Sequence, residues 1–135
     1  LPLEPEDAAR KAKRSLWYIE TVDAVTAHIK AHSDPDDLIL SWWEGYPVIA
    51  QRPGFIGVGF WESNAAKKLA PADRARYHVR DQEDVRQLVV TRQPRLIVFP
   101  DGTWEALVND MQMHYEPIGT FGLIRILQRR EPHNA

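Results

Sequence analysis

Aromatic, acidic and basic side chains that could bind a small ligand lie close together between residues 41 and 52. Trp42, Trp43 and Tyr46 surround Glu44, and Arg52 follows shortly after them. Indole and phenol rings can stack on a sugar ring, a carboxylate accepts hydrogen bonds from hydroxyl groups, and a guanidinium can hold a phosphate through two hydrogen bonds. If the chain binds a small molecule, we predict a carbohydrate or a sugar phosphate at these five residues.

The same aromatic residues also have a structural interpretation. Residues 38–42 form a short apolar run between turn signals, which is typical of a buried strand. Because adjacent residues of a strand point to opposite faces, at least one of Trp42 and Trp43 is expected in the core. Their position just after a strand still favours binding, since open α/β sheets hold ligands at the carboxyl ends of their strands.

Other residues whose types could bind a metal ion or catalyse a reaction are better explained by structural roles. His28 and His32 have a spacing that suits a metal ion on a helix, but no third ligand is obvious. We predict no metal and no cofactor, and two solvated histidines at a helix end. Asp101 follows the clearest strand, where a catalytic carboxylate could lie, but we favour a turn with Thr103 capping the next helix, which explains the same residues without chemistry. The spacing of residues supports no catalytic triad or carboxylate pair, so we predict no catalytic residue.

Hydrophobic periodicity and proline or glycine signals predict the elements that position these residues. Helices are predicted at residues 17–33, 46–50, 71–77, 81–91 and 103–111. Strands are predicted at residues 38–42, 55–61 and 95–99, followed by a hairpin after Pro117. Asp81 is expected to cap its helix, with Asp84 three positions further on.

Strands separated by helices predict an α/β fold with crossover connections. We expect a three-layer, mostly parallel sheet of four to five strands, centred on residues 95–99, with flanking helices and an antiparallel C-terminal hairpin at its edge. Residues 15–129 should form a single domain, after a connecting segment at 1–14 and before a tail at 130–135. The core should include Ile39, Leu88, Leu96, Val98 and Leu107.

Composition excludes several classes of protein. The chain has 135 residues, of which 44% are hydrophobic and 27% charged, with a formal net charge of −2. These values are ordinary for a globular domain and disfavour both disorder and a basic nucleic-acid surface. No apolar run reaches the roughly 18 to 20 residues that span a bilayer. The start at Leu1, without an initiator methionine, suggests a piece of a longer protein.

Several segments, taken in order, resemble a known family. They are the Asp-rich turn at 34–37, the aromatic segment 40–46, Arg52-Pro53-Gly54-Phe55, residues 75–79, residues 93–98 and the closing segment 119–126. Together they resemble the soluble C-terminal domain of polytopic glycosyltransferases of the dolichyl-phosphate-mannose-protein mannosyltransferase type and their bacterial relatives. The resemblance covers roughly residues 15–129.

The resemblance implies an accessory domain on the extracytoplasmic face of the cytoplasmic membrane, the periplasmic side in bacteria. In the family, a polyprenyl-phosphate carrier donates the sugar, and the catalytic carboxylate lies on an early loop between membrane helices. That loop is not part of this chain, so its partner would be the membrane-embedded portion of the same polypeptide. The alternative is a free-standing α/β small-molecule-binding or regulatory domain in the cytoplasm, and a small soluble hydrolase is the third choice.

Overall fold

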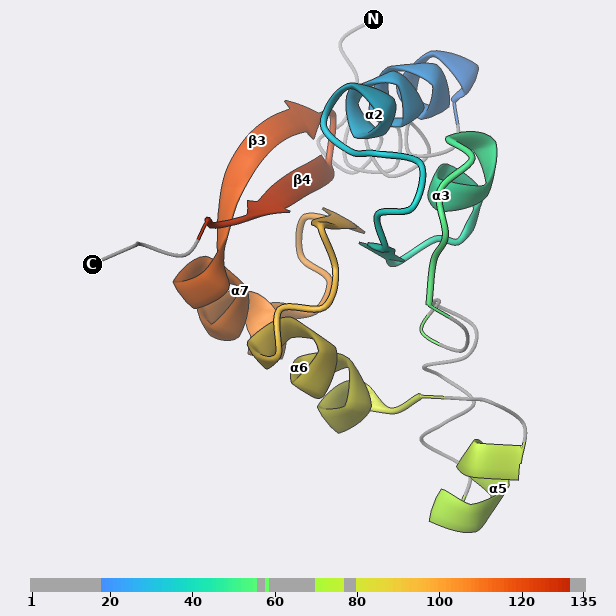
Figure 1. The fold of residues 1–135 in the computed structure, drawn as a ribbon, viewed down its shortest axis with the longest axis vertical. Helices are drawn as coiled ribbons and strands as arrows, with labels where there is room; N and C mark the ends of the chain where they lie inside the picture. Colours follow the sequence, from blue (N-terminus) through green and yellow to red (C-terminus); the bar gives the residue numbers. More distant parts are fainter. Residues whose placement is uncertain (1–17, 56–57, 59–69, 77–79, 132–135) are drawn as a thin grey trace, which may run out of the picture.

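The computed structural model describes residues 18–55, 58, 70–76 and 80–131 (Figure 1). The described strands are β1 (Ile39–Ser41), β2 (Leu96–Pro100), β3 (Tyr115–Phe121) and β4 (Ile124–Arg129). The described helices are α2 (Ile19–Ala31), α3 (Gly45–Ile49), α5 (Pro71–Arg76), α6 (Gln82–Val90) and α7 (Val108–His114), with a 3-10 turn, η2 (Glu105–Leu107). The predicted α/β class is confirmed, whereas most of the predicted strand at 55–61 lies outside the described residues.

The four described strands form one mixed sheet with the order β1-β2-β4-β3. β1 pairs with β2 in parallel, whereas β2 with β4 and β3 with β4 pair antiparallel. The predicted mostly parallel sheet is therefore not confirmed. The physical reason is that β4, the second strand of the C-terminal hairpin, pairs antiparallel with the central strand β2, so β1–β2 is the one parallel pair among the described strands.

β2 is central in the described sheet, as predicted, because it lies between β1 and β4 and all five of its residues are buried. Successive side chains of a strand point to opposite faces. Ile97 and Phe99 accordingly join one group of buried side chains, while Leu96 and Val98 join another.

We call these groups the α6-side core and the α2-side core. The α6-side core consists of Leu40, Val58, Val85, Leu88, Val89, Ile97, Phe99, Leu107, Met111, Tyr115 and Leu127. The α2-side core consists of Val25, Ile29, Ile39, Tyr46, Ala50, Leu96, Val98, Ile124 and Ile126. Helices α6 and α7 thus cover one face of the sheet, and α2 and α3 the other (Figure 1). All five predicted core residues are at most 4% exposed.

The sequence predicted a capping residue at the start of two helices, and one of the two predictions is confirmed. The predicted cap of α6 is confirmed: the Asp81 side chain accepts a hydrogen bond from the Asp84 backbone, and the Asp84 side chain accepts one from the Asp81 backbone. The predicted cap at Thr103 is wrong. Its hydroxyl donates to the carbonyl of Pro100 at 2.6 Å and closes a turn, so the chain passes through Trp104 before η2 and α7 begin.

The C-terminal hairpin is confirmed, but it begins earlier than predicted. β3 starts at Tyr115 and includes Pro117, which sits at a register shift between Pro117 and Gly119. A proline is tolerated there because β3 is an edge strand of the described sheet, so no neighbouring strand needs its missing N–H. Only β3 forms the expected antiparallel edge, since β4 lies inside the sheet.

Candidate functional site

The two tryptophans that follow β1 lie on opposite sides of the sheet. The backbone N–H of Trp42 donates to the carbonyl of Val98 at 2.9 Å, which continues the β1–β2 ladder by one residue. The half-buried Trp42 side chain packs against the α6-side core, and Trp43 packs against the α2-side core. This confirms the expectation that adjacent residues diverge, and it means that the two indoles do not form one stacking surface.

Trp43 and Tyr46 form an aromatic pair. Their ring centroids are 4.8 Å apart, with the planes at 88°, an edge-to-face geometry that rings favour. Gly45 permits this arrangement, because a Cβ atom there would lie 2.6 Å from Cε2 of the Trp43 indole. Tyr46 is only 2% exposed, and burial raises the pKa of its hydroxyl to about 12. Tyr46 therefore has a packing role in the α2-side core.

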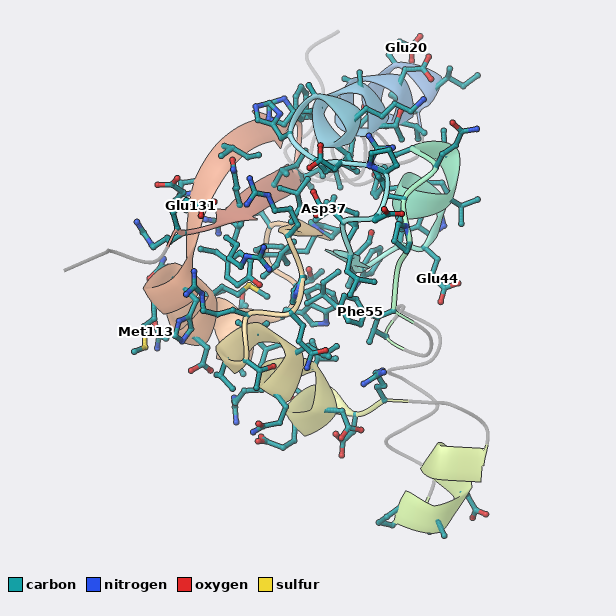
Figure 2. The ribbon with its side chains drawn as sticks, in the orientation of Figure 1. Glu20, Asp37, Glu44, Phe55, Met113 and Glu131 are labelled. Atoms are coloured by element: carbon teal, nitrogen blue, oxygen red, sulfur yellow. The ribbon has the colours of Figure 1, made fainter. Side chains whose placement is uncertain are left out.

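Glu44 and Arg52 have different environments. Glu44 is exposed at the start of α3, and its side chain projects outward from that helix (Figure 2). Arg52 is half-buried and faces the end of α2: its Nε donates to Ser33 Oγ at 2.9 Å and its Nη2 to the Ser33 carbonyl at 3.2 Å. Its Nη1 donates to the Ala50 carbonyl at 3.3 Å. Arg52 thus ties the end of α3 to the end of α2.

The five predicted ligand-binding residues therefore do not share one surface. Trp43, Tyr46 and Arg52 lie on the α2 side of the sheet, and Trp42 lies on the α6 side. Glu44 is the one exposed member of the five. Sugar binding at these residues stays a prediction.

The carboxyl end of β2 carries a feature that the sequence analysis missed. After the turn at Asp101 and Gly102, Trp104 adopts a left-handed backbone with φ 51° and ψ 33°. Its half-buried ring packs near Phe99, with centroids 6.0 Å apart, and also lines a hollow beside the start of α6. The sequence did carry a signal, a tryptophan just beyond the central strand, but periodicity placed it on a helix.

The histidines and Asp101 have structural partners. His28 Nε2 hydrogen-bonds with the Ile118 carbonyl at 3.0 Å, and His32 Nδ1 with the His28 carbonyl at 2.8 Å, so these rings are not simply solvated as predicted. Burial lowers the pKa of His28, and the neighbouring His32 lowers it further. Among the described residues, no three histidine or acidic side chains are placed to hold a metal ion. Asp101 is an exposed turn residue, 3.8 Å from Arg125.

Comparisons of the chain with protein families, with curated proteins and with solved structures find no match. None of the helices within the described ranges is both long enough and apolar enough to cross a bilayer. Function is therefore inferred from the residues and their arrangement.

Proposed function

We propose that this chain is a non-catalytic accessory domain of a membrane glycosyltransferase that uses a polyprenyl-phosphate sugar donor. It would lie on the extracytoplasmic face of the cytoplasmic membrane, next to the membrane-embedded portion of the same polypeptide. In this role the domain would cover the reaction site or hold the acceptor, while the membrane portion supplies the catalytic carboxylate. Nucleic acid is not an expected partner.

The observation that carries the proposal is that residues 39–54 pack together as one continuous segment of the fold. In the sequence resemblance, a strand, an aromatic segment, a short helix and an Arg-Pro pair follow one another. In the structure, β1, the aromatic residues and α3 are followed by Arg52, whose side chain closes the segment against the end of α2. Each part of the pattern thus has a packing role, which explains why the parts occur together.

The order of the remaining elements also supports the proposal. α2 precedes the turn at 34–37, α6 precedes β2, and the β3–β4 hairpin closes the described part of the chain, as the resemblance implies. We further propose the three-layer arrangement for the complete domain, which is supported by the packing of helices on both faces of the described sheet.

The proposal is tested on the full-length protein reconstituted in lipid vesicles with a polyprenyl-phosphate sugar. We expect several apolar membrane helices upstream of Leu1 in the full open reading frame, and sugar transfer by the reconstituted protein. Trp42→Ala and Glu44→Gln should raise the KM for the acceptor more than they lower kcat, because the domain binds and does not react. Glu116→Gln, an exposed substitution on β3, is the matched control. An open reading frame without membrane helices would refute the proposal.

The alternative is a free-standing α/β small-molecule-binding or regulatory domain. The observation that favours it is the hollow beside Trp104, whose volume of about 540 Å³ suits a small molecule. Such a domain would bind its ligand without any membrane portion. The full open reading frame separates the two proposals, since only the first requires upstream membrane helices.

A further inference from the structure

We propose that the hollow beside Trp104 binds a neutral carbohydrate, with the indole stacked on the sugar ring and polar side chains of α6 bound to its hydroxyl groups. The hollow has a volume of about 540 Å³, within the range of roughly 300–1,000 Å³ typical of small-molecule sites. It is lined by Asp81, Gln82, Glu83, Val85, Arg86, Trp104 and Glu105.

The position of the hollow in the fold is one where ligands bind. Trp104 lies just beyond the carboxyl end of β2, and β2 pairs in parallel with β1. In α/β sheets, ligand sites form beyond the carboxyl ends of parallel strands, because the loops that leave those strands converge there. The Trp104 ring is held on one side by the α6-side core, near Phe99. Its remaining surface lines the hollow as a fixed aromatic wall.

The polar lining suits hydroxyl groups better than a simple ion. A sugar hydroxyl both donates and accepts hydrogen bonds, so a site for it needs acceptors and donors together. Asp81, Glu83 and Glu105 provide carboxylate acceptors, and Gln82 and Arg86 provide donors. A site for a simple cation would need only the acceptors, so the donors Gln82 and Arg86 would have no role in it.

Arg86 is a fixed part of this lining. Its Nη1 donates to Glu83 Oε2 at 2.8 Å, and its Nε donates to Asp110 Oδ2 at 3.1 Å. Gln87 Nε2 also donates to Glu83, at 3.1 Å. Carboxylates outnumber the guanidinium in the lining, so a phosphate or another anion would meet net repulsion. The lining therefore favours a sugar without a phosphate group.

This inference does not depend on the membrane glycosyltransferase proposal. The hollow lies beside α6, whereas Trp43, Tyr46 and Arg52 lie on the α2 side of the sheet. A failure of sugar transfer by the full-length protein would leave the inference standing, and a failure of binding at Trp104 would leave the proposed function standing.

The test is a titration of the isotopically labelled 135-residue chain, followed by NMR. Methyl α-D-mannopyranoside and methyl β-D-glucopyranoside are the neutral probes, and mannose 1-phosphate and spermidine are the charged probes. The indole N–H signal of Trp104 is assigned by its loss in Trp104→Phe. We expect both neutral probes to shift this signal and the backbone signals of residues 82–86 at millimolar concentration, and the charged probes to bind there more weakly.

Three variants sharpen the test. Trp104→Ala should weaken binding of the neutral probes by about tenfold, through the loss of the stacking surface. Glu105→Gln should weaken it by about fivefold, because a neutral amide is a poorer acceptor than a carboxylate. Glu116→Gln, the same change on β3, should bind like the wild type.

Two results would overturn the inference. One is the absence of any shift at Trp104 with the neutral probes at tens of millimolar. The other is tighter binding of spermidine or mannose 1-phosphate than of both neutral probes. If Trp104→Ala does not fold, Glu105→Gln and the shifts of the wild-type chain still decide, and neutral-probe binding that Glu105→Gln leaves unchanged counts against the inference.

Discussion

Substitution of Arg52 by lysine separates a structural role for this side chain from the ligand-binding role that the sequence suggested. In the folded protein, the guanidinium donates five hydrogen bonds of 2.9 to 3.5 Å. The three shortest, at 2.9 to 3.3 Å, go twice to Ser33 and once to Ala50. A lysine ammonium keeps the charge but is a single point on a flexible stem, so it cannot reach all three acceptors together. We expect it to lose two of the three bonds.

The size of the effect follows from these bonds. A typical intramolecular hydrogen bond contributes about 1 kcal/mol net, so Arg52→Lys should lower the free energy of unfolding by about 2 kcal/mol. Arg52→Ala should lose about 3 kcal/mol, because it also removes the positive charge near the last turn of α2. For a domain of this size, 1 kcal/mol corresponds to a change in Tm of roughly 4 °C. Arg52→Lys should therefore lower Tm by about 8 °C.

Thermal unfolding followed by far-UV circular dichroism measures this change, and a urea titration gives the free energy directly. Arg130→Lys is the matched control, because Arg130 is exposed and its carboxylate partner lies 3.7 Å away. Its Tm should stay close to that of the wild type.

Unchanged stability of Arg52→Lys would refute the structural role. If phosphate also raised the Tm of the wild type and not of this variant, Arg52 would be an anion-binding residue, as the sequence analysis first predicted, because a ligand that binds the folded state stabilises it.

Three further predictions concern other contacts of the fold. Tyr115→Phe should lower the free energy of unfolding in urea by about 1–2 kcal/mol, because the Pro94 carbonyl loses a buried donor at 2.6 Å; no loss would mean that the carbonyl finds another partner. The pKa of His28 is lowered by burial, so the unfolded chain takes up a proton at higher pH than the folded protein, and stability present above about pH 6.5 is lost as the pH falls. Tm measured across this range should therefore fall more steeply in the wild type than in His28→Gln, and parallel curves would exclude His28 as the cause. Gly45→Ala should cost about 1–3 kcal/mol in urea unfolding and alter the near-UV circular dichroism, because the new Cβ displaces the Trp43 indole; an unaltered spectrum would contradict this contact.

The elements with strong local signals could be predicted from the sequence. α2 shows an apolar face with helical period, α6 carries its own capping box, and β2 is an apolar run bounded by turn residues. These signals act over a few residues, through backbone geometry and side-chain period. The buried positions of the core followed from the same patterns.

Local signals failed where a residue has more than one possible partner nearby. Thr103 could cap a helix or bond back to the last residue of β2, and the structure shows the second arrangement. The sequence predicted a hairpin only after Pro117, whereas β3 includes this proline, which an edge strand tolerates. At the edge of the described sheet, the missing N–H has no consequence for β3.

What only the tertiary structure decided is which elements meet. Periodicity shows which face of an element is apolar, but it does not show which element covers that face or which strands pair. The pairing of β4 with β2 was therefore not visible in the sequence. The same reason hid the partner of Arg52, which lies nineteen residues earlier at Ser33. It also hid the approach of Trp104 to α6, which creates the hollow. Sequence alone determined which side chains are available for chemistry, and packing between distant segments determined which of them share a site.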